Sequence, residues 1–304
     1  MSARNWGLLV LLALLWGSSF YFYKVLIAVL PPVTVVLGRV GIAAIALNLW
    51  LWAQGQALPL KDGMWLRFLW LGLLNNVVCF VLIAWSETRI TSGMASILNG
   101  TTPIFMVLVA HWLTHDDKMS VNKVTGILFG FAGTLVLVGP DALAGGGELL
   151  GELAVIVASC LYAFAAVYSR RFTGLSALVA ATGQVTGATV ILLPLSLLFD
   201  RPWTLAMPGA DIWASLLFIA LMNTAAAYWV YYKTLATTGV TYISLVTFLI
   251  PPVALLLGAV FLQESITLHA LIGMAIIALG LLAVDGRLLA RFKRLSMRSG
   301  PRSG

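Results

Sequence analysis

The sequence predicts an all-α integral membrane protein, with ten transmembrane helices arranged as two inverted five-helix repeats. Composition is the first supporting observation: hydrophobic residues form 61% and charged residues 10% of the 304 residues, and the mean hydropathy is +1.00. A soluble domain of this size could not bury so much apolar surface. The second observation is an internal repeat, which divides the apolar part of the chain into two similar halves.

The internal repeat relates residues 71–138 to residues 218–284. Three pairs fix its register: Asn75 with Asn223, Pro103 with Pro251 and, after a one-residue gap, Gly133 with Gly280. Both copies are read as a hydrophobic helix, a proline-bearing helix, an acidic turn and a glycine-bearing helix. A match that stays in phase over three helices indicates a duplication.

Ten apolar segments approach the length of about 20 residues that a membrane-spanning helix needs. They are residues 5–29, 33–54, 65–88, 92–114, 121–138, 148–171, 176–198, 210–234, 239–262 and 266–288. We assign residues 1–140 to the first repeat, 141–288 to the second repeat and 289–304 to a basic cytoplasmic tail. Because each repeat has five helices, the second enters the membrane from the opposite face, a topology typical of secondary transporters.

The distribution of basic residues predicts the orientation in the membrane. With a cytoplasmic N-terminus, fourteen of the 18 lysines and arginines lie on the inner side. The positive-inside rule then places both termini in the cytoplasm of a multi-pass protein of the bacterial inner membrane. A basic tail after the last membrane helix is explained by the cytoplasmic orientation of the C-terminus, so it gives no support for nucleic-acid binding. The apolar segment at residue 5 lacks an A-x-A cleavage site, so we interpret it as a retained helix.

The residues that could carry other chemistry are few. Cys79 and Cys160 lie inside apolar segments, where packing explains them. His111 and His115 share a helix face, but the glutamate of a metalloprotease motif is missing, so we expect a helix end. The glycines at 145–147 are not followed by the Lys-Ser/Thr of a phosphate loop. We therefore predict no metal, no cofactor and no enzymatic activity.

Several segments carry a resemblance to a known family: LLWGSSF at 14–20, LGRVGIAA around Arg39, TSGMASILNGTTPIF at 91–105, TYISLVTFLIPP at 241–252, FLQESIT at 261–267 and IGMAIIALGLLAV at 272–284. The chain resembles the EamA-type ten-helix exporters of the drug/metabolite transporter superfamily, and within them bacterial aromatic amino-acid exporters. The resemblance implies secondary transport, although the superfamily moves amino acids, nucleotide sugars, drugs and other metabolites. Related small multidrug exporters carry a mid-helix carboxylate that this chain lacks, which favours facilitated movement. Coupling through Lys24, Glu87, Arg89 or a terminal charge stays open.

Polar and aromatic side chains within the apolar segments are the candidate site residues, because such groups are costly in lipid unless they face protein or water. Those predicted to line a midplane cavity are Trp16, Ser19, Asn75, Asn76, Trp85, Ser96, Asn99, Tyr162, Asn223, Tyr228, Tyr231, Ser244 and Phe248. Interhelical hydrogen bonding or packing would explain the same residues. Pro103 and Pro251 are candidate hinges. Lys24 and Arg39 could attract a substrate carboxylate in an outer vestibule, or extend to the headgroups.

These observations favour an exporter or facilitator of amino acids, aromatic and other large neutral ones, working by alternating access around the cavity. The alternative is a broad-specificity drug or metabolite exporter of the same superfamily. The expected partners are a small-molecule substrate and the lipid bilayer, with no nucleic acid. The sequence is compatible with a monomer.

Overall fold

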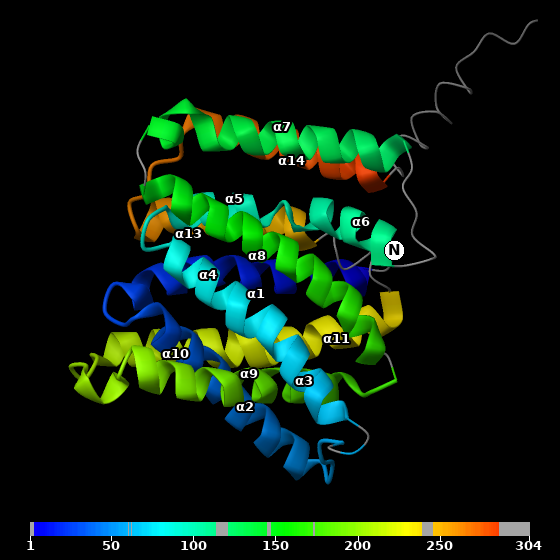
Figure 1. Cartoon of the computed structure of the whole chain (residues 1–304), viewed down its shortest axis with the longest axis vertical. Coiled ribbons are helices and arrows are strands. Elements are labelled where there is room, and N and C mark those ends of the chain that lie inside the picture. The colour runs from blue at the N-terminus through cyan, green and yellow to red at the C-terminus, as the bar shows by residue number, and fades with distance from the viewer. Residues whose placement is uncertain are drawn as a thin grey trace, which may run out of the picture.

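The protein is a bundle of helices (Figure 1). Its computed structural model describes residues 3–59, 61, 63–113, 121–144, 147–172, 174–238 and 246–285. Seven helical spans are long and apolar enough to cross a membrane, and three shorter apolar helices complete the predicted ten among the described residues. In the first repeat these are α1 (Ala3–Ile27), α2 (Pro32–Ala53), α3 (Met64–Gly72) with η1 (Leu73–Val78) and α4 (Cys79–Ser86), α5 (Ser92–Asn99) with α6 (Thr102–Leu113), and α7 (Val121–Ala144). In the second they are α8 (Gly147–Ser169), α9 (Ala177–Phe199), α10 (Ala210–Ala220) with η4 (Leu221–Ala226) and α11 (Ala227–Thr238), α13 (Val246–Phe261) and α14 (Leu268–Asp285).

The predicted boundaries differ from these in detail. α7 continues to Ala144, four residues beyond the boundary that we placed at residue 140. The division at 140 and 288 stays a prediction, and the tail at 289–304 lies outside the described residues.

Local sequence explains where several helices begin. Pro31 and Pro32 start α2, because a proline at the first helical position has no N–H to leave unpaired. The Thr91 hydroxyl accepts a hydrogen bond from the backbone N–H of Met94 and so caps α5. The span at 92–113 is interrupted between α5 and α6, just before Pro103. Proline removes one helical donor, and the Thr102 hydroxyl instead donates to the Asn99 carbonyl at 2.7 Å.

Two π-helical segments interrupt the third and eighth spans at equivalent places. η1 covers Leu73–Val78 and η4 covers Leu221–Ala226, so the two segments correspond under the same register that pairs Asn75 with Asn223. π-helical turns are rare and occur frequently at functional sites. The duplication has therefore preserved a local distortion of the helix in both repeats.

Four connecting turns lie together at one end of the bundle, on the left in Figure 1. They join α1 to α2, α4 to α5, α9 to α10 and α13 to α14, and we call this end the Glu264 end. Hydrogen bonds join these turns: the Lys24 ammonium donates to the Ile90 carbonyl, and the Ser92 hydroxyl donates to Glu264. α8 also begins here, because Gly151 lies against Ile90. Since α1 ends where α8 begins, the two repeats run in opposite directions.

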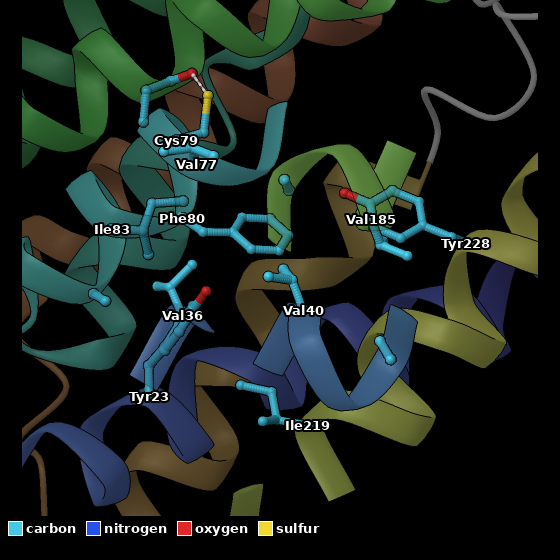
Figure 2. Close-up of a cluster of buried hydrophobic side chains, with 14 of the residues drawn as sticks. Tyr23, Val36, Val40, Val77, Cys79, Phe80, Ile83, Val185, Ile219 and Tyr228 are labelled. Atoms are coloured by element: carbon cyan, nitrogen blue, oxygen red, sulfur yellow. Dashed lines mark hydrogen bonds between the residues drawn. The ribbon is translucent and has the colours of Figure 1, made fainter. Parts of the chain in front are cut away.

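Part of the apolar core packs α4 against α1 and α2 within the first repeat. Val36 and Val40 of α2 face Phe80 and Ile83 of α4, with Tyr23 of α1 beside them, as Figure 2 shows. All five side chains are buried. This packing fixes α4 and the π-helical segment before it against the first two helices.

α7 and α14, one from each repeat, lie side by side along one edge of the bundle (Figure 1). Glycines let their backbones approach closely, as is common between membrane helices. A Cβ atom added at Gly133 would lie 2.8 Å from the backbone nitrogen of Ile277, and one at Gly280 would lie 2.7 Å from the carbonyl oxygen of Gly126.

We expect Gly133→Val to separate α7 from α14, because the new side chain would meet backbone atoms that cannot rotate away. Overpacking of this kind costs about 1–3 kcal/mol. Thermal unfolding in detergent should show a lower midpoint for Gly133→Val than for the control Ala132→Val, at an exposed neighbouring position. Equal midpoints for the two variants would contradict this close packing.

Candidate transport cavity

A cavity of about 180 Å³ lies between the two repeats, with walls from both. Nine of the predicted residues line it: Trp16, Ser19, Arg39, Asn75, Asn99, Pro103, Tyr162, Tyr228 and Tyr231. A larger hollow of about 890 Å³ lies between α2, α9 and α10. Its walls include Ile45, Leu193 and Met207, which are exposed on the outside of the bundle. The cavity between the repeats is therefore the candidate transport site.

Arg39 lines one end of this cavity and gives it a positive charge. It is 3% exposed, and its Nε donates to the Thr224 hydroxyl at 2.8 Å. Its Nη2 donates to the Asn223 carbonyl at 3.3 Å and lies 3.5 Å from the Ser19 hydroxyl. The guanidinium carbon lies 4.0 Å from the centre of the Phe80 ring, close enough for a cation–π interaction. α2 of the first repeat is thereby bonded to η4 of the second.

Gln184 of α9, in the second repeat, occupies the position that corresponds to Arg39 of α2 in the first repeat. Its Nε2 donates to the Asn76 side-chain oxygen at 2.6 Å, and its Oε1 accepts from the Tyr232 hydroxyl at 2.5 Å. The side-chain amides of Asn75 and Asn76 both donate to the Tyr228 hydroxyl, at 3.1 and 3.0 Å. α9 of the second repeat is thereby bonded to η1 of the first.

The two bonding patterns are related by the repeat. Arg39 is seven residues into α2 and Gln184 is seven residues into α9, and these helices begin at opposite ends of the bundle. At 1.5 Å per residue, each side chain sits roughly 10 Å in from its own end. Their acceptors, Thr224 and Asn76, occupy equivalent positions in η4 and η1. The cavity therefore has similar polar walls at its two ends, but only one of them is charged.

Aromatic rings form the wall between these polar ends. The Trp16 ring lies 5.5 Å from Tyr231 and 6.4 Å from Tyr228, centre to centre. Tyr232 lies 5.2 Å from Tyr231. Tyr162 of α8 also lines the cavity. Flat ring faces at these spacings can stack on an aromatic or large apolar ligand.

The other predicted residues lie elsewhere. Asn76 and Asn223 are fully buried behind the cavity wall, and Ser96 is buried with its hydroxyl donating to the Gly93 carbonyl at 2.7 Å. Pro251 is buried in α13 outside the lining. Trp85 packs under the Arg89 guanidinium at 3.9 Å. Ser244 and the Phe248 side chain lie outside the described part of the chain.

The two predicted vestibule cations have different surroundings. Lys24 does not line the cavity, and its ammonium donates to the backbone carbonyls of Glu87 and Ile90 at 2.6 and 2.8 Å. Arg39 lies in the cavity wall and not at a membrane surface.

Sequence reasoning missed several lining residues, among them Tyr23, Phe80, Thr102, Gln184, Tyr232 and Thr247. Gln184 and Tyr232 carry a usable signal, because each is a polar group deep inside an apolar segment. Tyr23 and Phe80 are indistinguishable in the sequence from ordinary packed aromatics.

Two carboxylates close the Glu264 end. Glu264 accepts from the Ser92 backbone N–H at 2.9 Å, the Ser92 hydroxyl at 2.7 Å and the Gly93 N–H at 3.2 Å. Asp200 accepts from the backbone N–H and the hydroxyl of Thr34, at 2.7 and 2.8 Å. Each carboxylate belongs to the second repeat and binds the N-terminus of a first-repeat helix, α5 or α2, where the helix dipole favours an anion.

Inverted five-helix repeats around a cavity with polar ends define a membrane transporter. The model of the EamA-like transporter family matches residues 5–139 and again residues 149–284. The chain therefore belongs to the EamA-like transporter family, within the drug/metabolite transporter superfamily.

Individual relatives cover nearly the whole chain. It is 28% identical over 280 residues to the uncharacterized transporter YoaV of Bacillus subtilis, covering 90% of this chain and 94% of YoaV. It is 27% identical over 302 residues to a probable terminal-alkyne amino-acid exporter of Streptantibioticus cattleyicolor, covering 97% and 98%. A crystal structure with 19% sequence identity superposes with a TM-score of 0.69 over 96% of this chain and 100% of the other, which shows a shared fold.

We expect Thr224→Val to destabilise the bundle, because it leaves the Arg39 Nε without its acceptor while preserving side-chain shape. Leaving a buried donor unpaired costs roughly 1–3 kcal/mol, and more when the donor is charged. The control is Thr189→Val, since the Thr189 hydroxyl bonds only to the Val185 carbonyl of its own helix. If both variants unfold at the same temperature, the bond between the repeats does not contribute to stability.

Proposed function

We propose that this protein is an exporter or facilitator of amino acids, in particular aromatic and other large neutral ones. Arg39 carries the proposal: it is a buried cation in the wall of an aromatic cavity. A buried charge in a membrane protein is costly and is typical of a functional site. Among the described residues no carboxylate lies within ion-pair distance of the guanidinium, so a substrate carboxylate is the natural partner.

The hydrogen bonds of Arg39 leave the Nη1 nitrogen, with its two N–H groups, for a ligand. Nε and Nη2 bond to Thr224, Asn223 and Ser19, whereas Nη1 donates to no described residue. An arginine bond to a carboxylate is charge-assisted and is roughly twice as strong as a neutral hydrogen bond. Thr224 and Asn223 hold the guanidinium in place, so a bound carboxylate meets a donor that is already oriented.

An amino group and a large side chain also find suitable partners. Asn99 lines the cavity, and its side-chain oxygen accepts no hydrogen bond from any described residue. Buried acceptors are normally paired, so this one suits the ammonium group of a ligand. The rings of Trp16, Tyr228 and Tyr231 offer an apolar surface for the side chain. The relative named as a probable terminal-alkyne amino-acid exporter supports an amino-acid substrate.

The transport cycle follows from the inverted repeats. Two similar halves can rock about the cavity and open it to either side at comparable cost. The positive-inside rule places the protein in a bacterial inner membrane with both termini in the cytoplasm, so that the Glu264 end faces outward.

Transport into proteoliposomes across a panel of amino acids tests the proposal. We expect phenylalanine, tyrosine or tryptophan to be transported, and Arg39→Gln to lower transport efficiency by about tenfold to a hundredfold, since a charge-assisted bond contributes roughly 1.5–3 kcal/mol. Arg201→Gln, at an exposed position away from the cavity, is the matched control. Transport of chemically unrelated drugs with equal efficiency would favour a broad-specificity exporter. Unchanged transport by Arg39→Gln would remove Arg39 from the site.

A further inference from the structure

We propose that Glu87 is a proton-binding gate residue: when its carboxyl group is protonated the Glu264 end stays closed, and when it ionises that end opens. Glu87 follows the last residue of α4, in the turn that leads to α5. It does not line the cavity, so this role is separate from substrate binding and holds for any substrate.

The carboxyl group of Glu87 is buried without hydrogen bonds. The residue is 0% exposed, and neither side-chain oxygen accepts a hydrogen bond from any described residue. An ionised carboxylate in such a place lacks both water and donors, which makes the charged form unfavourable. In the closed arrangement the group is therefore stable only when it carries a proton.

Nearby cations do not pair with this carboxyl group. The Lys24 ammonium donates to the backbone carbonyl of Glu87 at 2.6 Å, and not to its side chain. Tyr23, Arg39 and Glu264 also face it, from α1, α2 and the turn between α13 and α14. On α8, which packs against α4, the acidic groups at this end are Glu148 and Glu152. Burial outweighs the attraction of Lys24 and Arg39, and raises the pKa of Glu87 well above its ordinary range.

The turn that holds Glu87 belongs to the closure of the Glu264 end. Four residues separate Glu87 from Ser92, where Glu264 of the other repeat binds the start of α5. Opening this end requires these bonds between the repeats to break, and water then reaches the turn. An exposed glutamate ionises near pH 4.3, so opening releases a proton at any pH between this value and the raised pKa of the closed form.

The direction of the pH effect follows from this difference. Because the pKa is higher in the closed form than in the open form, acid stabilises the closed form, and this stabilisation is lost as the pH rises towards the raised pKa. Between the two pKa values, each pH unit multiplies the ratio of open to closed molecules by up to about ten. The proton enters and leaves on the same side, so it gates the protein without driving transport.

Distance measurements between spin labels test the gate. Labels at Thr88 and Ser265, exposed positions in the two repeats at this end, report its opening in lipid nanodiscs. The background carries Cys79→Ser and Cys160→Ser, which remove the two native cysteines. We expect a single short distance at pH 5 and a growing long-distance population at pH 8. Glu87→Gln should keep the short distance at both pH values, with a less than twofold change in the ratio.

Three further variants keep the test decisive. Glu148→Gln removes an exposed acid at the same end and should retain the full pH response. Lys24→Gln removes the cation that favours ionisation, so it should move the opening to higher pH even if Glu87→Gln does not fold. An unchanged response in Glu87→Gln, loss of the response in Glu152→Gln alone, or no response in the parent protein would overturn the proposal. No substrate is added, so the result is independent of whether amino acids are transported.

Discussion

The structure depends on one constraint: polar groups placed in the middle of the membrane must find partners there, and each repeat supplies partners for the other. Arg39 of the first repeat bonds to Thr224 of the second, and Gln184 of the second bonds to Asn76 of the first. Leaving any of these groups unpaired in a low-dielectric interior would cost several kcal/mol. The two halves are therefore tied together at the level of the cavity, where the proposed transport cycle requires them to move.

The π-helical segments make these bonds possible. η1 and η4 interrupt the helical ladder at equivalent places and present Asn76 and Thr224 to the opposite repeat. In η4 the Thr224 hydroxyl also donates to the Ile219 carbonyl at 2.9 Å, which satisfies a backbone acceptor next to the distortion. The duplication keeps this geometry while the side chains diverge. Arg39 in the first repeat corresponds to Gln184 in the second, so the symmetric scaffold encloses a cavity with a positive charge at one end only.

Much of the fold could be predicted from the sequence, because lipid imposes apolar segments of a defined length and the repeat fixes their register. Nine candidate residues line the cavity. They could be predicted because polar groups deep in an apolar segment are costly unless they face protein or water. The π-helical segments could not be predicted, since their residues have no distinctive local pattern. The burial of Glu87 was also missed, because its place at a helix end suggests exposure. Parts of the chain far away in sequence, Lys24 of α1 and Gly151 of α8, pack on this turn.

A structure of the protein in lipid nanodiscs with bound phenylalanine would test the central claim most directly. The account predicts ligand density between the repeats, with the carboxylate within hydrogen-bond distance of the Arg39 guanidinium and the ring against Trp16 and Tyr231. In that complex the Arg39–Thr224 bond should persist. Density outside this cavity, or a ligand carboxylate that turns away from Arg39, would contradict it.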